Sequence, residues 1–275
     1  MSAPTPPAIG CVGCGNMGGA ILGGLARHPA GPFGRLMGHD PDSAKIDALN
    51  TPEGLHIAAA PDAFTLARDC DVVILAVKPY LARDVVRGMA PALPGKLLLS
   101  IAAGVTLAQL RDWTGGGCAV VRCMPNTPAL VGKGVFALCL DDPQLTEGHK
   151  ALCRNIFNAL GTSTELPERL MTAFTSLVGA GPAYVFYLLD ALVQAGMTLG
   201  FTAAQSREMV LKLFDGSVAM AEASPLSLAT LREQVCSPAG VTIAGINQLD
   251  HDGVRGKLIG AVLATEARGR EMEQP

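Results

Sequence analysis

Three glycines near the start of the sequence have the spacing of a dinucleotide site. Gly13, Gly15 and Gly18 match the pattern G-x-G-x-x-G and follow the apolar run over residues 8–12. In this pattern the first glycine permits a tight turn, the second lets the backbone approach a pyrophosphate, and the third lets a helix pack closely on a strand. The phosphates would bind at the N-terminus of the following helix, where free N–H groups favour an anion. A plain glycine-rich turn is the alternative.

Asp40 bears on the choice of cofactor. It follows a short apolar segment over residues 34–39 and lies about 20 residues beyond Gly18, where this kind of fold places an acidic group at the adenosine ribose. A carboxylate accepts hydrogen bonds from the ribose hydroxyls and repels a 2'-phosphate, so Asp40 favours NADH over NADPH. His39 would instead suit a phosphate, and Asp40 could also simply cap a helix over residues 43–50.

A second possible anion site lies late in the chain, where residues 237–243 read Ser-Pro-Ala-Gly-Val-Thr-Ile. A proline-glycine turn that leads directly into a helix exposes backbone N–H groups, and Thr242 adds a hydroxyl. Such a site suits a carboxylate. Ordinary capping of the helix by Ser237 or Thr242 explains the same residues equally well.

Cys11 and Cys14 form a C-x-x-C pair, which is found in redox and metal sites. The sequence contains no second pair of this kind, and most of its eight cysteines lie in apolar segments. We therefore interpret both as buried thiols and expect no metal site. Residues 1–7 lack a basic region followed by an apolar one, so we expect a cytoplasmic protein with reduced cysteines.

The composition is that of a soluble globular protein. The 275 residues are 49% hydrophobic and 16% charged, which is enough for two domains with a large core. The net charge is −3 and the basic residues are dispersed. We therefore expect small metabolites as partners, and neither nucleic acid nor a membrane.

Strand and helix patterns alternate through the first part of the chain. The apolar segments 71–79, 96–101 and 119–124 are typical of parallel strands buried on both faces, and helical segments near 82–89 and 107–113 separate them. This alternation predicts a doubly wound sheet of the Rossmann type, with ligands outside the carboxyl ends of the strands. Strands over 134–140 and 161–165 flank a helix over 146–160, so we place the dinucleotide-binding domain at residues 1–165.

Residues 166–275 have helical periodicity and no strand-like segments, which predicts a second, all-helical domain. The segment 174–201 carries one formal charge, Asp190, and is long enough to span a membrane. Its glycines, Pro182 and the lack of basic flanks argue against that. A helix that is apolar on all sides must be buried, so we expect this domain to form a dimer.

Six segments, in the same order, resemble the pyrroline-5-carboxylate reductase family. They span residues 13–18, 76–79, 100–106, 122–128, 181–186 and 237–243. The Asn-Thr loop at 126–127 and the late Ser-Pro-x-Gly-x-Thr turn are the more specific ones. The resemblance implies an N-terminal Rossmann domain, a C-terminal helical dimerisation domain, and reduction of 1-pyrroline-5-carboxylate to L-proline by hydride transfer from NADPH or NADH.

The resemblance also implies site residues. The substrate carboxylate would be held by Gly240, Val241 and Thr242, and Glu168 would be an acidic group near the substrate. We predict Thr242 and Glu168 as the catalytic residues. The predicted cofactor contacts are Gly13, Cys14, Gly15, Asn16, Met17, Gly18, His39, Asp40, Pro41, Val77, Lys78, Ala103, Asn126 and Gln234.

The chain departs from the family pattern at a few positions. Val178 and Ala180 stand where serines are usual, Ala239 stands where the late turn commonly has glycine, and no Glu-His-Pro turn occurs near residues 224–228. Two alternatives stay open: another oxidoreductase of this architecture, acting on an imine or a 2- or 3-hydroxy acid, and a non-catalytic nucleotide-sensing oligomer. Hydroxy-acid enzymes use a positioned His or Lys to move a proton, and none of the five histidines lies in an evident catalytic loop.

Overall fold

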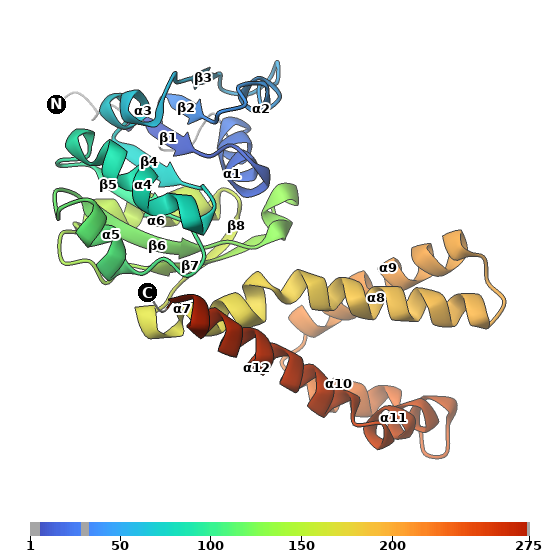
Figure 1. The fold of residues 1–275 in the computed structure, drawn as a ribbon. Helices are drawn as coiled ribbons and strands as arrows, with labels where there is room; N and C mark the ends of the chain where they lie inside the picture. Colours follow the sequence, from blue (N-terminus) through green and yellow to red (C-terminus); the bar gives the residue numbers. More distant parts are fainter. Residues whose placement is uncertain (1–5, 29–32, 274–275) are drawn as a thin grey trace. The chain divides into compact units, whose positions relative to one another are not determined.

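A computed structural model describes residues 6–28 and 33–273 of the chain (Figure 1). It divides into two compact units, one formed by Met1–Ala180 with Glu266–Pro275 and the other by Gly181–Thr265. The sheet unit therefore includes helical segments beyond residue 165, because Met171 is fully buried in its core and Glu273 pairs with Arg122 of a strand. The division of function at residue 165 stays a prediction.

The first unit is built on an eight-stranded sheet with the order β3-β2-β1-β4-β5-β6-β7-β8. All neighbouring strands are parallel except β6 and β7, so the predicted parallel sheet is mixed at this point. The reason is the connection, since residues 125–133 hold only a 3₁₀ turn at Thr127–Val131 and a parallel return needs a crossover of about a dozen residues or more. The strands are β1 (Ile9–Val12), β2 (Leu36–His39), β3 (Ile57–Ala59), β4 (Val72–Leu75), β5 (Leu97–Ser100), β6 (Ala119–Met124), β7 (Gly134–Cys139) and β8 (Gly161–Glu165).

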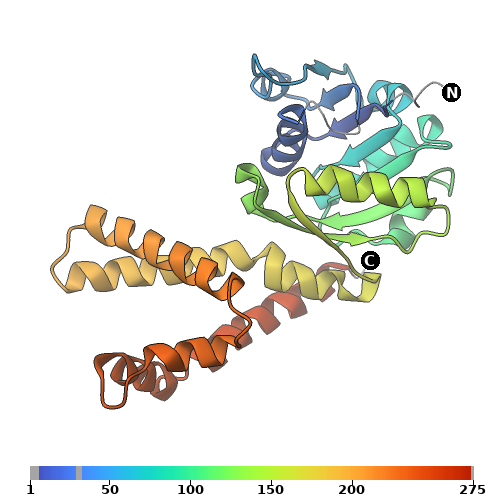
Figure 2. The ribbon, with the colours of Figure 1, turned by 180° about the vertical axis from the view of Figure 1, so that it is seen from behind.

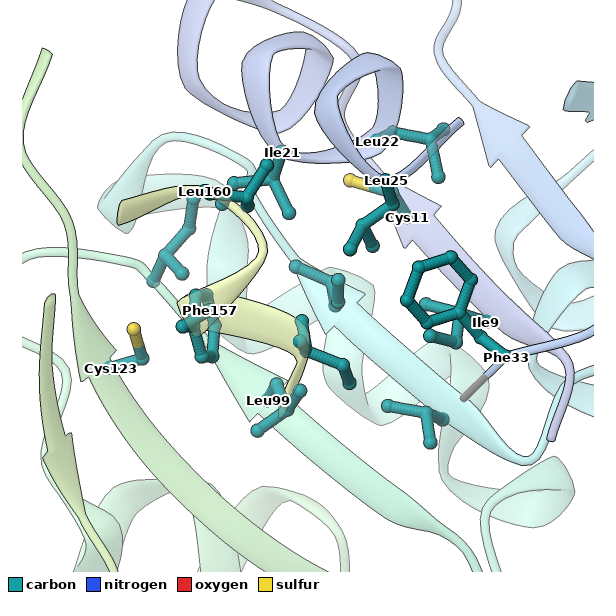
Figure 3. Close-up of a cluster of buried hydrophobic side chains, with 14 of the residues drawn as sticks. Ile9, Cys11, Ile21, Leu22, Leu25, Phe33, Leu99, Cys123, Phe157 and Leu160 are labelled. Carbon is teal, nitrogen blue, oxygen red and sulfur yellow. The ribbon is translucent and has the colours of Figure 1, made fainter. Parts of the chain in front are cut away.

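Helices cover both faces of this sheet (Figures 1 and 2). Figure 3 shows the apolar side chains beneath α1 and α6, among them Ile21 and Phe157. Along β4, Val72 and Ile74 belong to that core, whereas Val73 and Leu75 belong to the core on the other face. The strand is thus buried on both sides, as predicted. The helices of this unit are α1 (Asn16–Ala26), α2 (Ala44–Asp47), α3 (Ala63–Asp69), α4 (Pro79–Met89), α5 (Leu107–Trp113), α6 (Glu147–Asn158) and α7 (Met171–Phe174).

Some elements differ from the sequence-based prediction. Strand β3 and helix α3 were not predicted. Two of the three residues of β3 are alanines, which have low strand propensity. The start of α3 is fixed by a side chain: Oδ1 of Asp62 accepts a hydrogen bond from the N–H of Thr65 at 2.6 Å. Helix α2 is shorter than the predicted 43–50, and α4 begins at Pro79 rather than Ala82, since proline suits the first turn of a helix.

The second unit is entirely helical. Helices α8 (Gly181–Thr198), α9 (Ala203–Glu222), α10 (Leu228–Val235) and α11 (Val241–His251) precede α12 (Val254–Glu273), whose last turns belong to the sheet unit. Helices α8 and α9 lie side by side (Figures 1 and 2). A Cβ at Gly196 of α8 would lie 2.6 Å from Oγ of Ser206, so glycine permits their close approach.

The predicted apolar helix over 174–201 is interrupted. A π-helical turn, Thr175–Gly179, separates α7 from α8. Within the described residues, the stretch Glu168–Thr198 is the one helical region long and apolar enough to cross a membrane by length and composition. None of the residues of α8 is buried: Phe186 and Tyr187 are 65% and 77% exposed, and Leu199, just beyond the helix, is 79% exposed. An apolar surface of this extent is typical of an interaction site.

Candidate active site

A cavity of about 1000 Å³ lies at the carboxyl ends of β1, β2, β4 and β5, within the first unit. This volume is at the upper end of the usual range for small-molecule sites. Cys14 and Gly18 are buried and do not line the cavity, and Gln234 lies in the second unit. The predicted cofactor residues that line it are Gly13, Gly15, Asn16, Met17, His39, Asp40, Pro41, Val77, Lys78, Ala103 and Asn126.

The three glycines of the turn have three different surroundings. Gly13 has a φ of 94°, and a Cβ there would lie 2.8 Å from the carbonyl oxygen of Ala76. A Cβ at Gly18 would lie 1.9 Å from the carbonyl oxygen of Gly13, so α1 packs directly on the turn. A Cβ at Gly15 would meet nothing within 4 Å, and this residue faces the cavity. The turn thus leaves open backbone surface only where a ligand would approach.

The N-terminus of α1 has the properties of an anion site. Its N-cap, Gly15, makes no capping hydrogen bond through a side chain, and the first turn contains no acidic residue. The N–H groups of the first turn have no partner within the helix, which leaves them for phosphate oxygens. Together with the open space at Gly15, these groups fit the pyrophosphate of a dinucleotide.

Asp40 is committed to protein contacts that the sequence did not reveal. Its Oδ2 accepts a hydrogen bond from the N–H of Cys14 at 2.9 Å, and its Oδ1 accepts from the N–H of Asp42 at 3.0 Å and from Nζ of Lys45 at 2.9 Å. Burial acts to raise the pKa of Asp40, but the hydrogen bonds from Asp42, Lys45 and Cys14 outweigh it and the pKa is lowered. The charged carboxylate therefore ties the glycine turn to the end of β2. Ser43, not Asp40, is the N-cap of α2.

Lys45 and Asp42 also line the cavity, and neither was predicted as a site residue from the sequence. Lys45 could have been found as a basic residue one helical turn beyond the Asp40-Pro41-Asp42 segment. Its ammonium group places a positive charge among the carboxylates at the ribose end of the predicted site. The His39 ring contacts the protein itself, since its Nδ1 lies 3.1 Å from the carbonyl oxygen of Ala60.

Cys11 and Cys14 are buried free thiols beneath the turn. Sγ of Cys11 lies within hydrogen-bonding range of the carbonyl oxygens of Gly13 and Gly18. The hydrogen bond with Cys14, together with burial, raises the pKa of Cys11. Among the described residues, no group of three or more His, Cys, Asp or Glu side chains could hold a metal ion. The contacts of Cys11 and Cys14 are those of buried, packed thiols.

The late turn forms the start of α11 in the second unit. Gly240 is the N-cap of this helix, no side chain caps it, and its first turn has no acidic residue. Val241 is 92% exposed. Capping by Ser237 or Thr242, which was the alternative explanation, does not occur. The N–H groups that follow Gly240 therefore have the same uncapped arrangement as those at α1.

Comparisons with known proteins cover nearly the whole chain. The family model described as pyrroline-5-carboxylate reductase dimerisation matches residues 168–272, and the one described as NADP oxidoreductase, coenzyme F420-dependent, matches residues 8–104. The pyrroline-5-carboxylate reductase of Glycine max is 33% identical over 265 residues, which cover 96% of this chain and 95% of that protein. This chain belongs to the pyrroline-5-carboxylate reductase family.

Other members of the family agree in sequence and fold. The Escherichia coli (strain K12) pyrroline-5-carboxylate reductase is 34% identical over 255 residues, covering 92% of this chain and 94% of that protein. A crystal structure of the Plasmodium falciparum pyrroline carboxylate reductase, solved with NADP bound, has a TM-score of 0.89 and 30% identity, and covers 98% of this chain and all of that one. The predicted Rossmann-type fold with a C-terminal helical domain of the reductase family is confirmed.

Glu168, predicted as a catalytic residue of the reductase, contacts the start of α5 and the buried Arg122. Its Oε1 accepts a hydrogen bond from the N–H of Leu107 at 2.7 Å, at the start of α5, and lies 3.6 Å from Nη1 of Arg122. It is not among the residues that line the cavity. A direct role of Glu168 in the reaction stays a prediction, because none of these contacts tests it.

Asn126, in the loop that is specific to the reductase family, is held by backbone groups. The residue is 6% exposed, its Oδ1 accepts a hydrogen bond from the N–H of Val135 at 2.9 Å, and its Nδ2 donates to the carbonyl oxygen of Val178 at 3.4 Å. Val178 is one of the two positions where this chain lacks the usual serine, yet the contact uses only its backbone. The loop can therefore form one wall of the cavity without that hydroxyl.

Ala239 adopts a strained conformation in the late turn of this reductase. Its φ is 56°, and it is the one residue other than glycine with a positive φ in the described part of the chain. We expect Ala239→Gly to raise the free energy of unfolding by about 0.5 to 1 kcal/mol, since glycine removes a left-handed penalty larger than its entropic cost.

The matched control for Ala239→Gly is Ala223→Gly. Ala223 ends α9 in the right-handed region, with a φ of −80°, so glycine there is expected to lower the free energy of unfolding by a few tenths of a kcal/mol. Denaturant titration of both variants measures the two changes. Changes of the same sign would contradict the strain at Ala239.

Proposed function

We propose that this protein reduces 1-pyrroline-5-carboxylate to L-proline with NADPH or NADH as the hydride donor. The observation that carries the proposal is its identity of 33% and 34%, over nearly the full chain, with two proteins named pyrroline-5-carboxylate reductase. Two features of the chain support it. The glycine turn offers open backbone at Gly15 beside a cavity, and α11 begins with uncapped N–H groups beside Thr242.

The chain's own residues have mainly to bind and orient. The N–H groups of Asn16 and Met17 hold the pyrophosphate, and those of Val241 and Thr242 hold the substrate carboxylate. When bound, the reduced nicotinamide supplies a hydride to the carbon of the C=N bond. Because a protonated imine is already an electrophile, holding the reactants in contact supplies most of the required rate enhancement. The Thr242 hydroxyl donates a further hydrogen bond to the carboxylate, and a water beside it accepts a hydrogen bond from the protonated ring nitrogen, which keeps its proton.

The helical unit is proposed as the dimer interface. Its exposed apolar side chains, such as Phe186 and Tyr187 of α8, would be buried against a second copy. The dimerisation family model, which matches residues 168–272, supports this assignment. The free state of the described cysteines supports a cytoplasmic location. We propose a small-molecule substrate and no nucleic-acid or membrane partner.

The proposal is tested by adding 1-pyrroline-5-carboxylate to the purified protein with NADH or NADPH. We expect loss of the reduced-nicotinamide absorbance and formation of proline in equal amounts. Dinucleotide binding with no turnover would instead indicate a nucleotide-sensing oligomer. Reduction of NAD or NADP in the presence of a 2- or 3-hydroxy acid, with no imine reduction, would indicate another oxidoreductase.

Asp40 is expected to set the preference between the two cofactors. Asp40→Asn keeps an oxygen that can accept from Cys14 but removes the charge that repels a 2'-phosphate. We expect the ratio of kcat/KM for NADPH to that for NADH to rise about 10-fold, which is about 1.4 kcal/mol. Asp42→Asn removes the same charge from the same cavity wall and is the matched control. An equal change in both variants would contradict a specific role of Asp40.

A further inference from the structure

Arg122 is a buried charge whose main partner is far away in the sequence. The residue is 5% exposed and lies on β6, opposite Ser100 of β5 and Cys139 of β7. One of its guanidinium nitrogens donates to Oε1 of Glu273, the last residue of α12. A buried guanidinium is strongly destabilising without a carboxylate beside it. The C-terminal end of the chain supplies this one.

The same carboxylate oxygen is held by a second donor. Oγ1 of Thr172, a residue of α7 that is 5% exposed, donates to Oε1 of Glu273 at 2.6 Å. Figures 1 and 2 show the end of α12 beside α7. A Cβ at Gly269 would lie 2.7 Å from Cγ2 of Thr172, so the two helices are closer than a side chain at 269 would permit. The last turn of α12 is therefore seated on the sheet unit.

The last turn of α12 also contacts a wall of the cavity. Residues 101–106 connect β5 to α5, and Ile101, Ala102 and Ala103 of this loop line the cavity. Gly104 has a φ of 76°, and a Cβ there would lie 3.3 Å from the carbonyl oxygen of Met272. The backbone next to Glu273 thus packs against the loop one residue beyond its cavity-lining part.

The other end of this loop is held by the same group of charges. Glu168, which accepts from the N–H of Leu107, lies 3.6 Å from Nη1 of Arg122. Arg122 therefore connects the carboxylate that holds the start of α5 with the carboxylate that ends α12. Burial acts to raise the pKa of Glu273, but hydrogen bonds from Thr172 and Arg122 outweigh it and lower the pKa, so the carboxylate is charged at neutral pH.

We propose that Glu273 is a positioning residue for the dinucleotide cavity: through Arg122 it seats the last turn of α12 against the loop 101–106 and so fixes the wall formed by Ala102 and Ala103. The ligand in this inference rests on the proposed function, because the cavity is taken to bind NADH or NADPH. The inference itself concerns the contact between the C-terminal turn and the loop.

The test is direct binding of NADH and NADPH to the full-length protein, measured from reduced-nicotinamide fluorescence without substrate. We expect Glu273→Ala to raise the dissociation constant about 10-fold, because a loop released from its contact must be ordered again on binding. Glu273→Gln keeps an oxygen that accepts from Thr172 and Arg122, so about a 3-fold rise is expected, a partial rescue. The KM for the imine at saturating cofactor is expected to stay the same.

Glu271→Ala is the matched control, because Glu271 lies on the same turn but pairs with Arg268 at the surface. It should leave dinucleotide binding unchanged. If Glu273→Ala does not fold, Thr172→Val removes one hydrogen bond to the same oxygen and should raise the dissociation constant in the same direction. A lower Tm with an unchanged dissociation constant overturns the inference, since Glu273 would then only stabilise the fold. Failure of the unmodified protein to bind either cofactor contradicts the proposed function instead.

Discussion

Replacing Gly15 by Asp is expected to raise the dissociation constant for NADH and NADPH at least about 100-fold, while the free energy of unfolding stays the same or rises by a few tenths of a kcal/mol. Cofactor binding weakens while the stability of the fold does not, because the two effects arise from different contacts. Gly15 is the uncapped N-cap of α1, and Asp is a better N-cap than glycine. Its carboxylate would occupy the open space that the pyrophosphate requires.

Electrostatics sets the size of this effect. Two like charges about 4 Å apart repel by about 4 kcal/mol at the effective dielectric constant of a protein surface. A 100-fold loss of affinity corresponds to about 2.7 kcal/mol, so the repulsion alone is sufficient. Gly15→Asn adds a side chain of the same size without the charge, and is expected to weaken binding about 10-fold or less, through steric contact only.

Gly18→Ala is the complementary variant, because Gly18 is packed where Gly15 is open. A Cβ at Gly18 would lie 1.9 Å from the carbonyl oxygen of Gly13, which as a backbone atom cannot move aside. We expect the free energy of unfolding to fall by about 2 to 3 kcal/mol. Denaturant titration and cofactor binding, measured on all three variants, separate the two roles. Equal losses of stability at Gly15 and Gly18 would contradict this division.

The glycine turn shows how much of the site local sequence can predict. The spacing of Gly13, Gly15 and Gly18 fixed the turn, the helix and the direction of the cavity, because each role depends on backbone within a few residues. Periodicity likewise located β4, β5 and β6, with predicted ends that differ from the observed ones by at most four residues. These are properties of short segments, for which one sequence is sufficient.

Contacts between distant residues could not be predicted in this way. Arg122 and Glu273 are 151 positions apart, and nothing in the types of their neighbours pairs them. Asp40 was correctly placed at the end of β2, but its bonds to Cys14 and Lys45 use acceptor capacity that the prediction had assigned to ribose hydroxyls. Glu168 was predicted as a site residue from the resemblance to the reductase family. Its hydrogen bond from the N–H of Leu107, at the start of α5, joins residues far apart in the sequence.

The antiparallel strand β7 is a further example. Its sequence has the same apolar character as the parallel strands, so composition could not indicate its direction. The length of the connection sets the direction of the strand. Residues 125–133, with prolines at 125 and 128, were predicted only as a rigid loop, and they form a short 3₁₀ turn rather than a crossover. Asn126 lies in this loop and lines the cavity.

Thr242→Ala is expected to lower kcat/KM for 1-pyrroline-5-carboxylate about 10- to 100-fold, since a hydrogen bond to a charged group contributes about 1.5 to 3 kcal/mol. The N–H groups at the start of α11 remain in this variant, so activity is reduced rather than lost. The dissociation constants for NADH and NADPH are expected to stay the same. Thr242→Ser keeps the hydroxyl and should retain most of the activity.

The substrate itself supplies the sharpest control for this role. 1-Pyrroline has the same C=N bond but no carboxylate, so a threonine that grips the carboxylate should not affect its reduction, and the unmodified protein and Thr242→Ala should turn it over at the same slow rate. Thr198→Ala, which removes a hydroxyl bonded within α8 to the carbonyl oxygen of Gln194, should leave both substrates unaffected. An equal loss of rate for the two substrates in Thr242→Ala would show that the hydroxyl acts at the ring nitrogen rather than at the carboxylate. An unchanged kcat/KM for both would remove Thr242 from the site.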